Sequence, residues 1–533
     1  MFVTITFQSM VYEFFRRLRL MESKTKPCHR QICLAALTLT AFTMADAQQR
    51  PNVILFYADD LGYGDLQCYG GKNAATPNID RLADEGCRFT NAFSVAATST
   101  PSRYSLLTGQ YAWRKSGTDI ARGDAAMIIN PSQYTMADMF HNEGYVTAAI
   151  GKWHLGLGDK TGEQDWNAPL PMALSDIGFD YSYIMAATAD RVPCVFIENG
   201  RVANWDPSAP IEVSYIKPFL GVPTAKEHPE LCYNQQSDFG HNMAVVNGIG
   251  RIGYMKGGGK ALWKDEHLAD SIVGHAITFM RQHKNQPFFM YLATNDIHVP
   301  RFPNARFRGK NKMGVRGDVI AQLDWTMGQV MQALRQLGLD KNTIVIFSSD
   351  NGPVVNDGYK DRAEELLHGH SPAGPLRGNK YSAFEGGTHV PAIVWWPGHV
   401  QRKSVSKALV SQIDLMASLG QLINARLPKG AAPDSFKALD SWTGKNSVGR
   451  QWVVEEAANH TLSLRTKDWK YISPCSNPYK IMQNEQIETG YDDKPQLYKV
   501  AEDIHEDNNL ATQNPAETSR LKDLLDTIIG INQ

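Results

Sequence analysis

From residue 51 onward the chain alternates short apolar runs with segments whose apolar residues recur at helical spacing. The apolar runs are rich in β-forming residues and are predicted as buried strands at 53–57, 145–150, 288–293 and 343–348. Helices are predicted over 77–85, 135–143, 266–283 and 318–337, with Thr76, Thr135 and Asp318 at their starts. This alternation predicts an α/β fold, a mainly parallel sheet with helices on both faces.

The composition is that of a folded protein without a charge imbalance. Hydrophobic residues make up 43% of the 533 residues and charged residues 20%, which excludes disordered, collagen-like and coiled-coil chains. The 54 Lys and Arg residues nearly balance the 55 Asp and Glu residues, so the net charge is -1. Such a charge gives no electrostatic footprint for nucleic acid or an anionic membrane. We expect no nucleic-acid partner, and any bound anion must be held by local charges.

The N-terminal residues have the pattern of a secretory signal. Basic residues precede an apolar run at 32–44, and Ala45 and Ala47 are small residues at the positions that a signal peptidase reads. We predict a signal peptide over 1–47, and Met21 is the expected true start because the segment from there has ordinary signal-peptide proportions. The apolar run is shorter than the roughly 20 residues of a membrane-spanning helix, and no later stretch approaches that length. We therefore expect a periplasmic or secreted protein without a membrane span.

Two folded units are predicted after this leader. Residues 50–430 carry the alternation of strands and helices, which weakens beyond about residue 430. A hairpin is predicted over 462–472 and a further strand over 496–500. The last helix places Leu521, Leu525 and Ile528 on one stripe that can pack against this small sheet. Residues 431–533 are therefore predicted to form a smaller C-terminal α+β subdomain.

Polar clusters directly follow the predicted strands. Asp59 and Asp60 come after the first strand, and Asp350 and Asn351 come after the strand at 343–348. Each cluster alone is typical of a tight turn. The carboxyl ends of parallel strands meet at one edge of an open sheet, however, so the clusters can form one site. Their oxygen atoms are the ligands that a hard divalent cation such as calcium or magnesium prefers.

The segment 97–109 is predicted as a loop that enters a helix, with Pro101 near its first position and Gly109 after its end. Ser99 would lie just before the helix N-terminus, where free N–H groups favour an anion, and Arg103 would add a cation one turn later. The alternative interpretation is an ordinary capped surface helix with Ser99 as a loop serine.

Longer motifs give the chain a specific resemblance. The segment Ser99-Thr100-Pro101-Ser102-Arg103, followed by Leu106-Leu107-Thr108-Gly109, resembles the signature of the type I, formylglycine-dependent sulfatases. The segment from Gly144 to Gly151-Lys152-Trp153-His154 resembles a second signature of this family, and further similar blocks extend over nearly the whole mature chain. Two positions depart from the family pattern: Ser instead of Cys at 99, and His389 where Arg is frequent.

The resemblance implies an alkaline-phosphatase-like fold, with 50–430 as the catalytic sulfatase domain, and a set of site residues. Ser99 would be converted to formylglycine, whose hydrated aldehyde supplies the nucleophile and later expels sulfate. One calcium ion would be bound by Asp59, Asp60, Ser99 (as formylglycine), Asp350 and Asn351. The catalytic residues would be Ser99, Arg103, Lys152, His154, His298 and Lys380. In this scheme Lys152 and Lys380 hold the sulfate oxygens, and Arg103 stabilises the formylglycine oxyanion.

The two histidines would move protons in opposite directions. His298 would protonate the departing alcohol, and His154 would help to re-form the aldehyde by accepting a proton. The alternative is a structural role for these two histidines and a solvated surface position for Lys152 and Lys380. Asp190, Arg191 and Arg377 could contact the sugar, but structural ion pairs explain them equally well, so they are not part of the predicted catalytic set.

The function implied by the resemblance is hydrolysis of a sulfuric ester. Serine at position 99 together with a predicted signal peptide resembles bacterial carbohydrate sulfatases, so the expected substrate is a sulfated carbohydrate. A radical S-adenosylmethionine enzyme would be the maturation partner. Two alternatives stay open: a phosphoric or phosphonic ester hydrolase of the same fold that uses Ser99 directly, and a catalytically silent protein that binds sulfated glycans.

Overall fold

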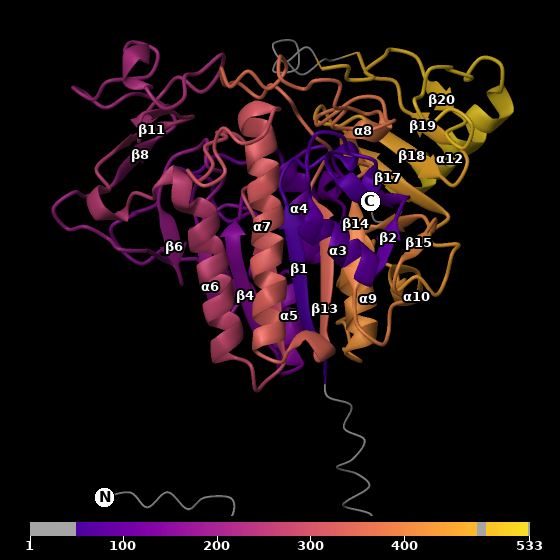
Figure 1. Cartoon of the computed structure of the whole chain (residues 1–533). Coiled ribbons are helices and arrows are strands. Elements are labelled where there is room, and N and C mark those ends of the chain that lie inside the picture. Colours follow the sequence, from indigo (N-terminus) through magenta and orange to yellow (C-terminus); the bar gives the residue numbers. More distant parts are fainter. Residues whose placement is uncertain (1–49, 477–486, 531–533) are drawn as a thin grey trace, which may run out of the picture. The chain divides into compact units, whose positions relative to one another are not determined.

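The computed structural model describes residues 50–476 and 487–530. The predicted signal peptide therefore lies outside the described residues. Within them the largest sheet has ten strands in the order β15-β2-β14-β13-β1-β12-β4-β5-β6-β7 (Figure 1). Its parallel centre consists of β13 (Thr343–Ser349), β1 (Asn52–Ala58), β12 (Phe288–Ala293), β4 (Val146–Lys152) and β5 (Tyr181–Met185). Antiparallel pairs extend it through β14 (Ala392–Trp395) and β2 (Cys87–Phe89) on one side and β6 (Phe196–Glu198) and β7 (Arg201–Val202) on the other. At the far edge β15 (Ser404–Ser406) pairs with β2 in parallel.

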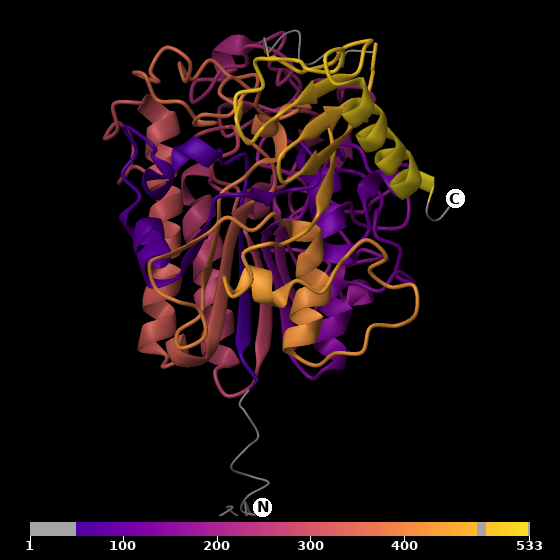
Figure 2. The same ribbon diagram turned by 90° about the vertical axis from the view of Figure 1, so that its right-hand side faces the viewer.

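Helices cover both faces of this sheet. One group of contacting helices comprises α3 (Pro77–Glu85), α6 (Leu268–Gln282) and α7 (Gly314–Gln336). A second group comprises α4 (Ser99–Thr108), α5 (Met136–Asn142) and α9 (Leu415–Leu422). Figure 2 shows helices on both sides of the strands. The predicted mainly parallel α/β fold is therefore confirmed.

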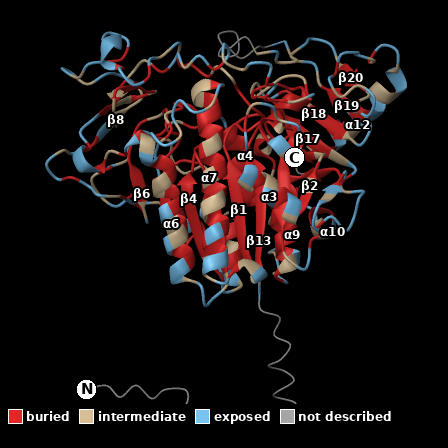
Figure 3. Ribbon diagram, in the orientation of Figure 1, coloured by how far each residue is buried: buried red, intermediate tan, exposed pale blue. Residues whose placement is uncertain are grey.

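The central strands are buried along their whole length, as their unbroken apolar sequences predict (Figure 3). In β1, Val53 pairs in register with Phe289 of β12 and with Ile344 of β13. Because β1, β4, β12 and β13 run in parallel, the polar residues that follow them emerge at the same edge of the sheet. This edge is where the candidate site forms.

The C-terminal part forms a separate small sheet. Its antiparallel strands are β17 (Trp452–Glu456), β18 (Leu462–Thr466), β19 (Lys470–Ile472) and β20 (Gln496–Tyr498). The helix α12 (Pro515–Gly530) packs Leu521 and Leu525 against Leu464 and Tyr471 of this sheet. The predicted C-terminal α+β subdomain is thus confirmed, while its exact boundary near residue 430 stays a prediction. In the described part of the chain, no helix combines the length and apolar character needed to cross a membrane.

Two predicted helix starts are wrong in detail. The helix predicted from Asp318 begins at Gly314, and the Asp318 carboxylate instead accepts hydrogen bonds from the backbone N–H groups of Gly309, Lys310 and Asn311. Thr76 precedes α3 but its side chain does not cap the helix.

The carboxylate of Asp324 on α7 caps α3 instead. It accepts hydrogen bonds from the backbone N–H groups of Asn78 and Ile79, both at 2.9 Å. A residue distant in sequence therefore does what the local pattern assigned to Thr76.

Candidate active site

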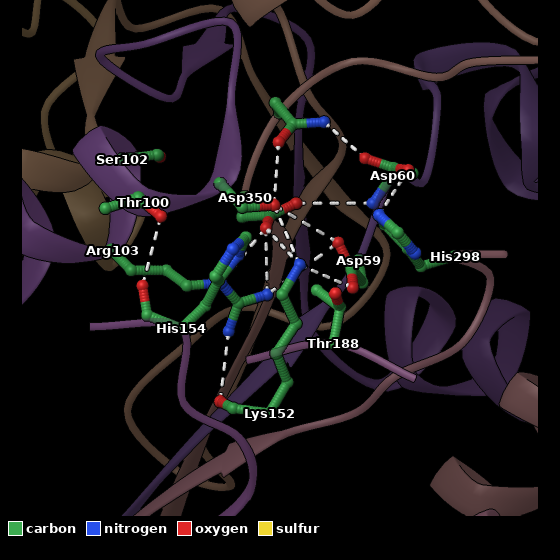
Figure 4. A network of polar contacts seen from close by, with 12 residues as sticks. Asp59, Asp60, Thr100, Ser102, Arg103, Lys152, His154, Thr188, His298 and Asp350 are labelled. Carbon is green, nitrogen blue, oxygen red and sulfur yellow. Dashed lines mark hydrogen bonds and ion pairs between the residues drawn. The ribbon is translucent and has the colours of Figure 1, made fainter. Parts of the chain in front are cut away.

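Five segments bring their polar residues together at the carboxyl edge of the sheet (Figure 4). Asp59 and Asp60 follow β1, His154 follows β4, His298 follows β12, and Asp350 follows β13. The loop after β13 also carries Lys380, and α4 contributes Ser99 and Arg103. All the sequence-predicted site residues are buried: Asp59, Asp60, Ser99, Arg103, Lys152, His154, His298, Asp350, Asn351 and Lys380.

Ser99 is the first residue of α4 rather than a residue before it. Thr98 is the N-cap residue with an extended backbone, Pro101 is the third helical residue, and Gly109 ends the helix with φ 63°. The Ser99 Oγ accepts a hydrogen bond from the Nζ of Lys152 at 2.8 Å. The same Oγ lies 3.4 Å from Asp59 Oδ1 and 3.3 Å from Asn351 Oδ1. Ser99 thus lies where α4, β1, β4 and β13 meet.

Three carboxylates face three cations at this point. Lys152 Nζ lies 2.6 Å from Asp59 Oδ2, and Arg103 binds Asp350 Oδ2 through Nε at 3.1 Å and Nη2 at 2.8 Å. Lys380 Nζ lies 2.9 Å from Asp60 Oδ2. All these side chains are buried, so each ion pair fixes the position of the groups around it.

Burial and crowding of like charges decide which groups are ionised. Burial raises the pKa of Asp59 well above its ordinary value, and the charge of Lys152 only partly offsets this rise. The neighbouring carboxylates of Asp350 and Asp60 raise the pKa further. Burial likewise lowers the pKa of Lys152. Although burial opposes it, Arg103 and Lys152 hold the pKa of Asp350 below the ordinary range. Negative charge is therefore crowded around Asp59, which an additional cation would relieve.

The oxygen atoms of this cluster suit a hard divalent cation. Asp59, Asp60 and His298 offer ligand atoms that lie within 4.8 Å of one another. Asp60 Oδ1 accepts a hydrogen bond from Asn351 Nδ2 at 2.7 Å, so the Asn351 side chain is held beside the carboxylates. Carboxylate, amide and hydroxyl oxygens are the donors that calcium prefers, and the crowded negative charge fits such an ion. The nitrogen of His298 suits it less well.

His154 is arranged to accept a proton. Its Nε2 lies 2.9 Å from the carbonyl oxygen of Ala121; since a carbonyl can only accept, Nε2 carries the hydrogen. Its Nδ1 is buried and has no hydrogen-bond partner among the described residues. Burial, followed by the charge of Lys152, lowers the pKa of His154 well below its ordinary value. The imidazole is therefore neutral, with a lone pair on Nδ1.

His298 has the opposite orientation. Its Nδ1 donates to the carbonyl of Val299 at 2.7 Å, which leaves Nε2 facing Lys380 Nζ at 3.4 Å and Asp60 Oδ2 at 3.7 Å. Burial, followed by the charge of Lys380, lowers the pKa of His298 to about 4. In this state His298 is neutral near pH 7, and an anion bound beside it would favour protonation of Nε2.

A cavity of 170 Å³ opens onto these groups. Ser99, His154, His298 and Lys380 line it, whereas Arg103 and Lys152 of the predicted catalytic set are not among its lining residues. Lining residues outside the predicted catalytic set include Arg122, Asp190, Arg191, Tyr215, His241, Asp357 and Tyr381. The side chains of His241 and Asp357 come from loops that carry no motif of their own, so no local signal could have found them.

The residues that the sequence left undecided make ion pairs. Asp190 binds Arg191 at 2.8 Å and His241 Nε2 at 2.9 Å, inside the wall of the cavity. Arg377 binds Glu488 and the carbonyl of Glu506. His389, which departs from the family pattern, has its Nδ1 3.0 Å from Glu385 Oε2. Arg377 and His389 are therefore engaged with neighbouring structure.

A family model described as Sulfatase matches residues 51–425, which is most of the chain. The chain belongs to the sulfatase family. An N-acetylgalactosamine-6-O-sulfatase from Bacteroides thetaiotaomicron is 50% identical over 480 residues, covering 90% of this chain and 93% of the relative. Human arylsulfatase A is 30% identical over 404 residues, covering 75% of this chain and 69% of the relative. The protein is therefore a sulfatase, an enzyme that hydrolyses sulfate esters.

Solved structures of other proteins share the fold. One solved structure is of a Bacteroides thetaiotaomicron protein described in connection with the metabolism of multiple glycosaminoglycans. It has a TM-score of 0.88 and 50% identity, covering 90% of this sulfatase and 99% of that chain. A phosphonate monoester hydrolase of Agrobacterium radiobacter has a TM-score of 0.56 and 16% identity, covering 91% of this chain and 96% of that chain. This second likeness concerns the fold alone and carries no support for phosphonate hydrolysis.

Proposed function

We propose that this sulfatase removes the 6-O-sulfate from an N-acetylgalactosamine residue of a sulfated carbohydrate. The observation that carries the reaction is the position of Ser99, which meets Lys152, Asp59 and Asn351 at a cavity of 170 Å³. The choice of sugar rests on the 50% identical relative, which is an N-acetylgalactosamine-6-O-sulfatase.

We propose calcium as the resident ion. Asp59, Asp60, Asp350, Asn351 and residue 99 would hold it, because these residues supply buried oxygen donors and three of them are carboxylates crowded together. When bound, the ion would withdraw electron density from the sulfate oxygens and lower the pKa of an attacking hydroxyl. The protein itself contributes Arg103, whose two contacts with Asp350 keep that carboxylate aimed at the cluster.

We propose that Ser99 is oxidised to formylglycine by a radical S-adenosylmethionine enzyme. A hydrated aldehyde at this position would supply a hydroxyl nucleophile and a route for releasing sulfate that serine lacks. The N-terminal position of Ser99 on α4 favours negative charge there, because the first N–H groups of the helix are free of intrahelical partners. Lys152 adds a positive charge 2.8 Å from the Ser99 oxygen.

Lys380, which lines the cavity, and Lys152, whose Nζ lies 2.8 Å from the Ser99 Oγ, would bind the sulfate oxygens. Although burial opposes it, the Asp357 and Asp60 carboxylates raise the pKa of Lys380, so its ammonium stays charged. A charged ammonium in a buried cavity strongly favours an anion over a neutral ligand. These two lysines therefore supply the electrostatic part of sulfate recognition.

The two histidines divide the proton transfers. His154 is neutral and its Nδ1 is without a partner in the described structure, so it can take a proton from the hydroxyl at residue 99. His298 faces the cavity through Nε2 and would give a proton to the sugar oxygen once the bound anion has raised its pKa. The pKa of about 4 in the absence of substrate keeps His298 from being permanently charged.

A periplasmic or secreted location is part of this proposal. It rests on the signal-peptide pattern of residues 1–47.

A combination of mass analysis and activity assay tests the proposed function. Peptides that contain residue 99 are measured from protein made with and without the maturation enzyme; formylglycine is lighter than serine by the mass of molecular hydrogen. Both preparations are then assayed on sugars sulfated at defined positions. We expect turnover of the 6-O-sulfated N-acetylgalactosamine substrate only where the lighter peptide is present.

The alternatives give different results in the same experiment. Turnover of phosphate or phosphonate esters by protein with an unmodified serine would support direct use of Ser99. Binding of sulfated glycans without turnover, even with formylglycine present, would indicate a silent binding protein.

A further inference from the structure

The loop after β13 contains a buried carboxylate, Asp357. This residue has no role in the proposed mechanism. It is 5% exposed and lines the cavity beside Lys380 and His298. Its Oδ2 lies 3.0 Å from Lys380 Nζ, and its Oδ1 accepts a hydrogen bond from the Tyr381 hydroxyl at 2.9 Å. The negative charge of a carboxylate so close to a sulfate site would repel the substrate unless a neighbouring cation offset it.

Two consecutive residues bind the two oxygens of this one carboxylate. Neighbouring side chains of an extended chain point to opposite faces, which would prevent such an arrangement. Tyr381 has φ 76°, outside the extended region, and both side chains reach Asp357. Two hydrogen bonds fix the backbone of Tyr381: its N–H donates to the carbonyl of Ala97, and its carbonyl accepts from the hydroxyl of Tyr491. The uncommon conformation is therefore held by contacts on both sides of the peptide.

Lys380 has two carboxylate partners, of which only one is a proposed calcium ligand. Asp60 Oδ2 lies 2.9 Å from its Nζ, and Asp357 Oδ2 lies 3.0 Å from it. Asp60 is a proposed calcium ligand, so its oxygens would be shared with the ion. Among the described residues, no hydrogen bond or ion pair joins Asp357 to the proposed calcium ligands. Its charged partners are Lys380 and His298, whose Nε2 is 3.9 Å away.

We propose that Asp357 is a positioning residue that holds the Lys380 ammonium in the cavity at the place where it meets the sulfate group. This inference rests on the proposed function, because it assigns Lys380 to sulfate binding. Lys380 ends in a point charge on a long flexible stem, and a fixed anionic partner restricts where that charge can go. Asp357 acts through Lys380 and is not itself a catalytic residue.

The test is calorimetric titration of the calcium-loaded, formylglycine-containing enzyme with inorganic sulfate, together with kcat and KM for the sugar sulfate. Asp357→Asn keeps the shape of the side chain and removes its charge. We expect sulfate affinity to fall about 10- to 100-fold, which is the usual effect of losing a supporting partner or of a misplacement of about 1 Å. KM should rise in parallel. Asp357→Glu restores the charge and should recover part of the affinity.

Three comparisons decide between positioning and other roles. In a Lys380→Met background, Asp357→Asn should cause no additional loss of sulfate affinity, because its effect passes through the lysine. Asp361→Asn, in the same loop, breaks a buried 2.7 Å ion pair with Arg301 without touching Lys380 and should leave sulfate affinity unchanged. Tyr381→Phe removes one contact of Asp357 and should weaken sulfate binding in the same direction, which provides a second variant if Asp357→Asn does not fold.

The positioning role is overturned by any of three outcomes. Asp357→Asn that binds inorganic sulfate normally but loses the sugar sulfate would place Asp357 against a sugar hydroxyl. Equal losses in Asp361→Asn would indicate general damage to the loop. An additional loss in the Lys380→Met background would mean that Asp357 acts independently of the lysine. Failure of the wild-type enzyme to bind inorganic sulfate or to turn over the sugar sulfate would instead contradict the proposed function itself.

Discussion

The ammonium of Lys152 lies 2.8 Å from the hydroxyl of Ser99, and both residues are buried. The lysine comes from the last residue of β4 and the serine from the first residue of α4. The same ammonium lies 2.6 Å from Asp59 Oδ2. Lys152 therefore connects the residue that is proposed to carry the nucleophile with a carboxylate that is proposed to bind the ion.

Lys152→Met should separate anion binding from cation binding. Methionine fills much of the volume but removes the charge, so inorganic sulfate should bind more weakly and kcat/KM should fall about 10²- to 10³-fold. Calcium affinity should stay the same or increase, because a cation that repels the ion is gone. Calorimetry with each ion measures the two effects separately. Loss of both affinities together would indicate a collapsed site and contradict this division.

Asp350→Asn should impair both calcium binding and folding stability. The variant removes a charged oxygen ligand and takes from the fully buried Arg103 guanidinium its nearer anionic partner, so that only Asp59, at 3.9 Å, is left. Breaking one side of a buried ion pair costs about 3–5 kcal/mol. Chemical denaturation with and without calcium measures this loss, and the stabilisation by calcium seen for the wild type should shrink. Undiminished turnover would mean that Asp350 serves only the turn after β13.

The parallel sheet could be predicted from the sequence, and so could the convergence of its strand ends at one edge. Unbroken apolar runs such as 288–293 can only be buried on both faces, and parallel order then places Asp59 and Asp350 at one edge. Local cues were less reliable at helix starts. Ser99 was predicted before α4 and is in it, because Thr98 takes the extended N-cap conformation.

Contacts between segments distant in sequence explain what could not be predicted. The Asp324 carboxylate caps a helix that begins 247 positions earlier at Pro77, and the pairing of Asp190 with His241 joins two loops. Neither partner carries a local signal for the other, because capping and ion pairing need only spatial proximity. Asp357 falls in the same class, since its partners Lys380 and Tyr381 come from a later part of the loop.

Asp324→Asn should change how stability depends on pH. Burial raises the pKa of Asp324 to about 6, although the N–H groups of Ile79 and Asn78 favour its charge. An unfolded Asp has a pKa of about 3.9, so between these values the folded protein binds more protons than the unfolded chain. The contribution of this group to stability is therefore fully present below about pH 4 and declines as pH rises through 6.

The comparison with the variant isolates this effect. Each pKa unit corresponds to about 1.4 kcal/mol. Between pH 4 and pH 7, the free energy of unfolding of the wild type should therefore fall by on the order of 2–3 kcal/mol relative to that of Asp324→Asn. Unfolding midpoints of both proteins across this range give the difference directly, because other titrating groups are shared. A constant difference would show that Asp324 has the same pKa in the folded and unfolded chain.

His298→Ala tests the proposed general acid with two leaving groups. A sugar hydroxyl is a poor leaving group as an alkoxide and needs a proton, whereas an aryl alcohol with a strongly electron-withdrawing ring can leave as a stabilised anion. Nε2 of His298 is the ring nitrogen that faces the cavity, since Nδ1 is bound to the carbonyl of Val299. Positioned general acids contribute about 10²- to 10⁴-fold, so the variant should lose that much on the sugar sulfate and clearly less on the activated aryl sulfate. The ratio of the two losses cancels any general damage to folding, because both assays use the same preparation. Equal losses would assign His298 to binding the sulfate group, and the proton would then have to come from another residue, with His154 as the next candidate.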